Sequence, residues 1–367
     1  MTTRKALAAT MYVYAVLGGG GFIGQHVVKM LAERERSVLE IRVLDVKWAS
    51  RVASSTVNVT YTYCDITNVR MLTQCLEGVD AVLHCAGIVD VFGHVPPSEL
   101  YRINVAGTEN LIAACTIAGV RALVLTSSME VVGPNANFDP FIGNEDTPYP
   151  CIPSCAYAES KALAEQLVLR ANGCVVEGGE PLRTCALRPT GVYGENDTML
   201  PRLLHRYRSM GSAIPRTISR DVQHSRVYVG NVAWMHVLAA RELLACNARV
   251  CGSAYFCYDG TPSYNYEELN VKLMARAGIS FRGNTIPQPV LTALAHVNSA
   301  VQTVSATLTH RRIGFTLTPH TLKTANTTFV VVTSKAKNDM GYKPVVSWEE
   351  ACERTSLWLA SGKVSKS

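Results

Sequence analysis

Short apolar runs alternate with amphipathic stretches along the first half of the chain. The apolar runs are rich in Val, Ile and Leu and cover residues 12–17, 41–45, 60–65, 81–87, 122–128 and 184–189. Stretches with apolar positions at helical spacing lie between them, at residues 24–36, 68–76, 98–118 and 156–171. Strands buried on both faces are apolar throughout. The alternation therefore predicts βαβ units and an α/β fold with a Rossmann-type, doubly wound parallel sheet.

The second half of the chain is less regular. Prolines divide it into short pieces, at Pro201, Pro215, Pro262, Pro287, Pro289 and Pro319. We expect residues 1–10 to be an N-terminal extension and residues 11–190 to form the sheet core. Residues 191–367 are expected to form mainly a smaller C-terminal substrate lobe, with some segments returning to the core.

The composition is that of a folded protein with a large core. Of the 367 residues, 48% are hydrophobic and 17% are charged, which argues against disorder. The net charge of +6 is spread along the chain. The densest basic stretch, residues 202–208, is more typical of a solvated helix face than of a nucleic-acid site. We therefore expect no nucleic-acid partner.

The twelve cysteines mostly lie inside apolar runs, and none forms a C-x-x-C pair. Only Cys151 and Cys155 are close together in a loop-like stretch, and the second pair that a zinc site needs is missing. We expect reduced thiols, no bound metal and an intracellular protein, either cytoplasmic or peripheral on the endoplasmic reticulum membrane.

Two segments bear on secretion and membranes. The N-terminus has basic residues followed by an apolar run, as a signal peptide does. That run leads directly into a glycine loop, which favours a first strand and argues against secretion. Residues 286–308 are apolar but interrupted by polar residues. They are a poor spanning helix, and they suit either ordinary core or an amphipathic helix in peripheral contact with a membrane.

A glycine loop follows the first predicted strand and opens the first predicted helix. Residues 18–24 read Gly-Gly-Gly-Gly-Phe-Ile-Gly, which fits both G-x-x-G-x-x-G and G-x-G-x-x-G. Backbone can approach a pyrophosphate closely only where side chains are absent, and a helix N-terminus offers free N–H groups to the phosphates. The expected dinucleotide contacts come from Gly18, Gly21, Phe22, Ile23 and Gly24.

Acidic residues end the next two predicted strands. Asp45 lies 21 residues after Gly24, where a carboxylate accepts hydrogen bonds from the adenosine ribose hydroxyls. Because this carboxylate repels a 2′-phosphate, the sequence predicts NAD rather than NADP, although Lys47 lies nearby. Asp65 and Ile66 are expected to bracket the adenine ring.

Tyr157 and Lys161 are four residues apart at the start of a predicted helix, so they share one helix face. A phenol has a pKa near ~10, and a neighbouring ammonium together with oxidised nicotinamide is expected to lower it. Such a phenol accepts the proton of a substrate hydroxyl while a hydride leaves. A tyrosine and a lysine at this spacing are common on surface helices. The pair indicates catalysis only because it follows a dinucleotide-binding pattern in the sequence.

A third candidate, Ser128, closes the Thr-Ser-Ser sequence at the end of the fifth predicted strand. The carboxyl ends of strands in a doubly wound sheet line the ligand crevice. The Ser128 hydroxyl is therefore expected to hydrogen-bond the reacting oxygen opposite Tyr157.

These residues together resemble the extended short-chain dehydrogenase/reductases, and longer segments narrow the resemblance. TSSMEVVGPN, LRPTGVYGE and above all RVYVGNVAWMHVLAA, at residues 226–240, are similar to the 3β-hydroxysteroid dehydrogenase/Δ5–Δ4 isomerase family. The likeness covers residues 12 to about 359 and looks closest to the poxvirus-encoded branch. The hydrophobic anchor region of the animal enzymes is weak here. Leu17 departs from the family, which usually has Thr before the first glycine.

The resemblance implies NAD-dependent oxidation of a 3β-hydroxy-Δ5 steroid to the 3-ketone, followed by isomerisation of the double bond. It assigns Ser128, Tyr157 and Lys161 to the oxidation, and places residue Pro189 beside the nicotinamide. It also implies that Tyr255 and Asp259 form the acid/base pair of the isomerisation. Whether the protein forms a homodimer stays open.

Two other readings remain. A nucleotide-sugar epimerase or dehydratase would use the same Ser–Tyr–Lys arrangement and turn over no net cofactor. A non-catalytic dinucleotide-sensing module would usually lack the tyrosine or the lysine, and both are present.

Overall fold

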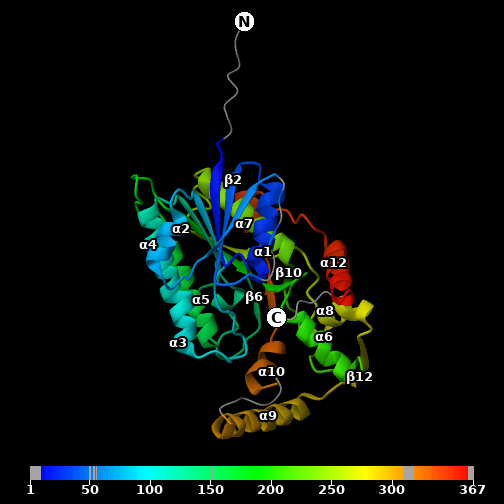
Figure 1. The fold of residues 1–367 in the computed structure, drawn as a ribbon. Coiled ribbons are helices and arrows are strands. Elements are labelled where there is room, and N and C mark those ends of the chain that lie inside the picture. The colour runs from blue at the N-terminus through cyan, green and yellow to red at the C-terminus, as the bar shows by residue number, and fades with distance from the viewer. Residues whose placement is uncertain are drawn as a thin grey trace.

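A seven-stranded parallel sheet forms the centre of the molecule, with helices on both faces (Figure 1). The structure, a computed structural model, describes residues 10–48, 51–52, 54, 56–150, 152–309 and 317–362, so Cys151 and most of the expected N-terminal extension lie outside the described residues. The strands of this sheet are β1 (Tyr12–Leu17), β2 (Val38–Asp45), β3 (Asn58–Tyr63), β4 (Ala81–His84), β5 (Ala122–Thr126), β7 (Arg183–Pro189) and β11 (Ser253–Cys257).

The strand order across the sheet is β3-β2-β1-β4-β5-β7-β11, and every neighbouring pair is parallel. From β1 the chain moves outward to β3, and from β4 it moves outward in the opposite direction. The order therefore reverses between β1 and β4, which is where doubly wound sheets bind their ligands. The predicted fold class is confirmed, and the six predicted strands are present with ends shifted by a few residues.

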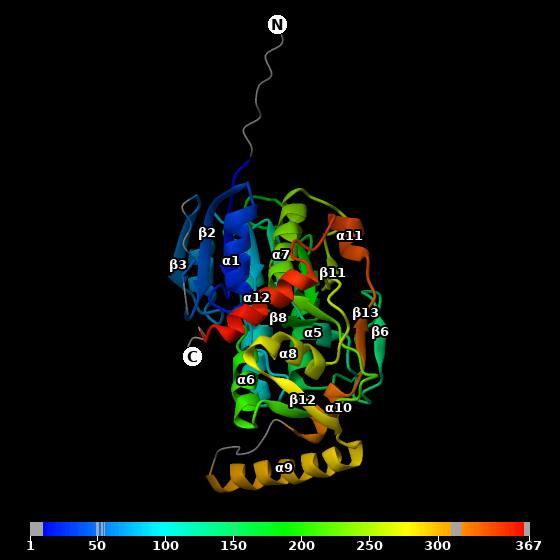
Figure 2. The same ribbon diagram turned by 90° about the vertical axis from the view of Figure 1, so that its right-hand side faces the viewer.

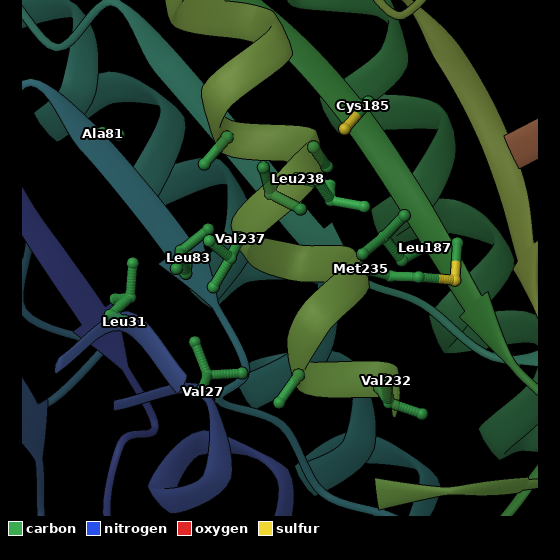
Figure 3. Packing of buried hydrophobic residues seen from close by; sticks show 14 of the residues in the cluster. Val27, Leu31, Ala81, Leu83, Cys185, Leu187, Val232, Met235, Val237 and Leu238 are labelled. Atoms are coloured by element: carbon green, nitrogen blue, oxygen red, sulfur yellow. The ribbon is translucent and has the colours of Figure 1, made fainter. Parts of the chain in front are cut away.

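Two layers of helices cover the sheet. One layer consists of α1 (Phe22–Arg34) and α7 (Val229–Leu244). Figure 3 shows Val27 and Leu31 of α1 on the side of Leu83 of β4, and Met235 of α7 beside Leu187 of β7. The other layer consists of α2 (Val69–Leu76), α4 (Gly107–Ala118) and α5 (Ala156–Arg170). The inner strands β1, β4 and β5 are buried on both faces, which explains their apolar sequences. The edge strand β3 is partly exposed and carries Asn or Thr at alternate positions.

The predicted helix at residues 98–118 is divided in the structure. It consists of α3 (Pro97–Leu100), a π-helical segment η1 (Tyr101–Ala106) and α4. The π-helical segment carries Asn104, whose side chain bonds the backbone of Ile88 and the hydroxyl of Ser160 on α5. This contact fixes the loop after β4 against the start of α5.

The remaining elements form a lobe beyond the carboxyl edge of the sheet and its connections (Figures 1 and 2). The short strands pair as β13–β6, β10–β8 and β12–β9. Their bounds are β6 (Phe141–Gly143), β8 (Gly191–Tyr193), β9 (Ala213–Arg216), β10 (Arg226–Tyr228), β12 (Ser280–Thr285) and β13 (Phe329–Val331). The helical elements are η2 (Met129–Val131), α6 (Leu200–Ser209), α8 (Tyr266–Met274), η3 (Ala275–Ala277), α9 (Gln288–Thr309), α10 (Pro319–Ala325) and α12 (Trp348–Ala360). From the same half of the chain, α7, β11 and α11 (Lys335–Met340) belong to the sheet core.

Candidate active site

The glycine loop closes against the backbone at the switch point between β1 and β4. Gly18 has a φ of +80°, and a Cβ there would overlap the backbone of Ala86 after β4. A Cβ on Gly24 would overlap the carbonyl oxygen of Gly18. The loop then enters α1, whose N-cap is Gly21, so Phe22 and Ile23 form the first turn. Because glycines carry no side chain, this turn fits the close approach of a pyrophosphate to a helix N-terminus.

Leu17, the departure from the family pattern, does not weaken this turn. Its side chain is buried among core residues, including Val13 and Leu44. The loop is held by backbone hydrogen bonds, from the Gly18 N–H to the Leu44 carbonyl at 2.7 Å and from the Gly21 N–H to the Gly18 carbonyl at 3.1 Å.

Asp45 lies beside the glycine loop at the end of β2. One carboxylate oxygen accepts a hydrogen bond from the Gly20 N–H at 2.9 Å, and the other accepts one from the Val46 N–H at 2.7 Å. Asp65 follows β3, the neighbouring strand, and accepts hydrogen bonds from Thr67. Ile66 is buried against Gly107 of α4. The structure therefore brings Asp45, Asp65 and Ile66 to one edge of the sheet next to the glycine loop.

Tyr157 lies in the first turn of α5 and is 5% exposed. Burial raises the pKa of its phenol, and the nearby Glu130 carboxyl raises it further, whereas a hydrogen bond with the Ser128 hydroxyl lowers it. The Ser128 hydroxyl therefore lies beside the Tyr157 phenol, and the predicted contact of both with a substrate oxygen stays a prediction. The hydroxyl of Thr126, earlier in the same Thr-Ser-Ser sequence, forms a 2.7 Å hydrogen bond with the His236 ring.

Lys161 lies one turn after Tyr157 and is also buried. Its ammonium donates a 2.7 Å hydrogen bond to the carbonyl of Thr126 at the end of β5. Burial lowers the pKa of Lys161 to about 8, while the carboxyl of Glu165 opposes this change. Desolvation by burial is the largest influence on the Tyr157 phenol, and the lowering expected from Lys161 together with oxidised nicotinamide stays a prediction.

A buried ion pair supports the face of α5 that carries Tyr157 and Lys161. Glu165 lies one turn beyond Lys161 and binds Arg188 of β7 with an Nη2–Oε1 distance of 2.6 Å and two Nε contacts of 3.1 Å. The two side chains are 0% and 4% exposed. Tyr149 donates a 2.6 Å hydrogen bond to the same carboxylate. Pro189 follows Arg188, so the ion pair holds the end of β7 against α5.

Tyr255 is not brought together with Tyr157. In β11 its side chain belongs to the cluster under α1 and α7, the layer opposite α5. Its hydroxyl bonds the Arg249 carbonyl at 3.0 Å and the Asp339 carboxylate at 3.1 Å. Successive residues of a strand point to opposite faces, so the side chain on the α5 side at this point of β11 is Phe256.

Asp259 serves as an anchor between segments. One of its oxygens accepts hydrogen bonds from the Tyr228 N–H at 2.9 Å and the Asn231 side chain at 2.8 Å. The other accepts bonds from the backbone and hydroxyl of Thr261. Asn231 also bonds Val346 and is fully buried. The RVYVGNVAW segment, at the start of α7, therefore owes part of its pattern to this hydrogen-bond network.

A carboxyl that the motif analysis did not single out lies at the same site. Glu130 follows Ser128 by two residues in η2, and its backbone N–H bonds the Ser128 hydroxyl at 3.2 Å. Burial raises the pKa of Glu130 to about 7. The sequence feature that could have identified Glu130 is its position two residues after Ser128, just beyond the carboxyl end of β5.

Comparisons with known proteins agree with this geometry. The model of the 3-beta hydroxysteroid dehydrogenase/isomerase family matches residues 15–288. The mouse protein named 3 beta-hydroxysteroid dehydrogenase type 7 is 46% identical over 95% of both chains. The vaccinia virus (strain Western Reserve) protein named 3 beta-hydroxysteroid dehydrogenase/Delta 5-->4-isomerase is 43% identical over 95% of this chain and 99% of its own. Similarity thus extends to both the viral and the animal branches.

Solved structures of the same architecture are more distant in sequence. A dTDP-glucose 4,6-dehydratase from Streptomyces venezuelae, solved with NAD, has a TM-score of 0.69 at 22% identity and covers 95% of this chain and 97% of its own. A Thermus thermophilus UDP-glucose 4-epimerase, also solved with NAD, has a TM-score of 0.65 at 22% identity and covers 96% and 100%. These likenesses concern the fold alone, whereas the family model and the relatives cover most of the sequence. The chain belongs to the 3-beta hydroxysteroid dehydrogenase/isomerase family.

Proposed function

We propose that this protein oxidises 3β-hydroxy-Δ5 steroids to 3-ketosteroids with NAD⁺ and isomerises the double bond from Δ5 to Δ4. The observation that carries the proposal is the buried Tyr157 phenol, which lies beside the Ser128 hydroxyl at the carboxyl edge of the sheet. A pair of hydroxyls at this position binds one oxygen from two sides. The family membership supplies the class of alcohol.

The glycine loop and the acid after β2 are proposed to hold the cofactor. Gly18, Gly21, Phe22, Ile23 and Gly24 would contact the phosphates. Asp45 would bind the ribose hydroxyls, Asp65 with Ile66 would border the adenine, and Pro189 would border the nicotinamide. NAD⁺, when bound, supplies the acceptor for the substrate hydride. Residues 11–190 would hold the cofactor, and residues 191–367 would contribute mainly the substrate lobe.

In the oxidation, Tyr157 takes the proton of the 3β-hydroxyl while the C3–H bond breaks. Ser128 donates a hydrogen bond to the same oxygen and keeps it aligned with the phenol. Desolvation opposes the phenolate, so the ammonium of Lys161 is required to stabilise negative charge in this region. Its bond to the Thr126 carbonyl and the charge of Glu165 hold that ammonium in place.

The test uses the purified full chain with NAD⁺ and pregnenolone. Production of NADH together with a conjugated 3-ketone is the expected result. Conversion of a nucleotide sugar, without NADH from any 3β-hydroxysteroid, would instead establish the epimerase or dehydratase alternative. NAD binding without any turnover would establish the sensing module.

We also propose that α9 rests on a membrane surface. Leu291 and Ala295 of α9 are buried against Leu322. The opposite side exposes a stripe of apolar side chains that are 48–63% exposed, namely Val290, Leu294, Val297, Val301 and Val304. Figure 2 shows α9 along the lower edge of the molecule, away from the sheet. Within the described residues no helix is long and apolar enough to cross a bilayer, so contact would be peripheral.

The charge of the surrounding sequence favours an anionic lipid surface as the partner of this stripe. Residues 269–338 contain no Asp or Glu. They contain the basic residues Lys272, Arg276, Arg282, Arg311, Arg312, Lys323, Lys335 and Lys337. An apolar stripe in a stretch of sequence that is basic and free of acidic residues is typical of helices that lie in the interface of anionic membranes.

Co-sedimentation with vesicles tests this contact. Binding to phosphatidylcholine vesicles that contain phosphatidylserine is expected to fall in Leu294→Glu and to stay unchanged in Leu357→Glu, a control at an equally exposed apolar residue of α12. Self-association through α9, measured by sedimentation equilibrium and lost in Leu294→Glu, would show instead that the stripe is a homodimer contact.

A further inference from the structure

Arg226 begins the RVYVGNVAW segment and carries a buried charge. Its side chain belongs to a residue that is 6% exposed, and its Nε donates a 2.7 Å hydrogen bond to the carbonyl of Gly191. Among the described residues, neither of its Nη atoms has a hydrogen-bond or ion-pair partner. A buried charge is costly unless it is paired, so a buried guanidinium normally binds an anion.

The nearest acidic side chain does not supply this anion. The charge of Asp197 acts on Arg226, but the two residues form no ion pair. Asp197 instead accepts hydrogen bonds at the start of α6, from the N–H groups of Met199 at 2.6 Å and Leu200 at 3.1 Å. Burial also raises the pKa of the Asp197 carboxyl, which disfavours its charged form. The Nη atoms of Arg226 therefore stay available to an anion from outside the chain.

Two aromatic rings complete a cluster around this guanidinium. The guanidinium lies over the ring of Tyr266, the first residue of α8, with its Cζ 5.2 Å from the ring centroid. His224 stacks on Tyr266 with the ring centroids 3.9 Å apart, and its two ring nitrogens have no hydrogen-bond partner in the described part of the chain. Burial lowers the pKa of His224 to about 3 and raises that of Tyr266 to about 12, so both rings are neutral near pH 7. The cluster thus carries one positive charge, on Arg226.

The cluster lies beside the proposed reaction site. β8 begins two residues after the end of β7 and pairs in parallel with β10, which places Arg226 opposite Gly191. The charges of Arg226 and Glu130 both act on the Tyr266 phenol, and the charge of Glu130 also acts on Tyr157. Tyr266 is therefore near both the guanidinium and the oxidation site. A molecule whose hydroxyl is held by Tyr157 can extend past Tyr266 to Arg226.

We propose that Arg226, together with Tyr266 and His224, binds a carboxylate at the end of the substrate opposite the 3β-hydroxyl; the proposal rests on the steroid function above. The steroid nucleus is rigid, so a hydroxyl fixed at C3 holds the side chain on C17 at the far end of the molecule. A guanidinium binds a carboxylate through two parallel hydrogen bonds, and a buried setting strengthens them. The preferred substrates are then 3β-hydroxy-Δ5 steroids with an acidic side chain. Neutral steroids react at the same centre and leave the guanidinium without its anion.

The test compares 3β-hydroxychol-5-enoic acid, whose side chain ends in a carboxylate, with its neutral methyl ester. In the wild type, kcat/KM for NADH production should be roughly 10–100-fold higher for the acid, the usual effect of hydrogen bonds to a charged group. Arg226→Gln should bring the two substrates to similar kcat/KM values, mainly through a higher KM for the acid. Arg220→Gln, which removes an exposed positive charge from the same lobe, is the matched control and should keep the preference for the acid.

Two milder variants keep the test valid if Arg226→Gln folds poorly. Arg226→Lys retains the charge but loses the paired hydrogen bonds, so it should keep only part of the preference for the acid. Tyr266→Phe keeps the ring and removes only the hydroxyl, so it should lower the preference without abolishing it.

Calorimetric titration of the acid and the ester into the protein with NADH measures their binding without turnover. The acid should bind more tightly, and this difference should disappear in Arg226→Gln. Equal binding of acid and ester by the wild type, or a preference that persists in Arg226→Gln, would overturn the assignment. A loss of NADH affinity in Arg226→Gln with the preference for the acid intact would do the same, because it would assign the guanidinium to the cofactor. Absence of NADH production from both steroids would refute the proposed oxidation, whereas the titration would still decide whether Arg226 binds the carboxylate.

Discussion

Replacing Glu165 by Met should leave the Arg188 guanidinium as an unpaired cation in the core. The pair is 0% and 4% exposed, so water cannot replace the lost carboxylate. Removal of one partner of a buried ion pair costs about 3–5 kcal/mol in the free energy of unfolding. The lost Tyr149 hydrogen bond adds about 1 kcal/mol. The Nη1 atom of Arg188 already has no partner among the described residues, so few alternative contacts are within its reach.

Urea unfolding of four proteins measures this cost: the wild type, Glu165→Met, Arg188→Met and the double variant. Both single variants should be destabilised by several kcal/mol. The double variant should recover most of that loss, because two apolar side chains need no charge partner. As a matched control, the exposed i, i+4 pair of Arg354 and Glu350 should contribute no more than about 0.5 kcal/mol.

The same variant has a kinetic readout. The Glu165 carboxyl raises the pKa of Lys161 against desolvation, so its loss should move that pKa below about 8. Lys161 is a base, and a lower pKa means that the ammonium is lost at lower pH. The alkaline limb of the oxidation rate should therefore shift to lower pH. Single variants within about 1 kcal/mol of the wild type, or a double variant as unstable as the singles, would refute the coupling described for the pair.

Three further substitutions test the proposed cofactor and oxidation sites. Tyr157→Phe should slow oxidation by roughly 10²–10⁴-fold, with NAD binding retained in a calorimetric titration; a fully active variant would disprove the proton transfer. Gly24→Ala should weaken NAD binding by about 1–3 kcal/mol because its Cβ meets the Gly18 carbonyl, and Gly21→Ala, whose Cβ stays 3.2 Å from that oxygen, should weaken it less. Asp45→Ala should lower the preference for NAD⁺ over NADP⁺, measured as a ratio of kcat/KM values, by roughly 10–100-fold; an unchanged ratio would contradict the ribose contact.

The predicted fold followed from features that are local in sequence. Apolar strand runs and intervening helices identify βαβ units, and the βαβ rule then orders the sheet. The split of the segment at residues 98–118 was not predictable from periodicity. The π-helical segment is only six residues long, too short to disturb the apolar pattern, and its Asn104 bonds a loop and a helix that are distant in sequence.

The candidate site shows where local reasoning fails. The i, i+4 spacing of Tyr157 and Lys161 was sufficient to place both on one helix face. Their pKa values depend on how deeply the two side chains are buried, and burial cannot be inferred from the spacing. The face of Tyr255 depends on the register of β11 with β7, a pairing between residues about 70 positions apart. The hydrogen bonds of Asp259 likewise come from α7 and its preceding strand.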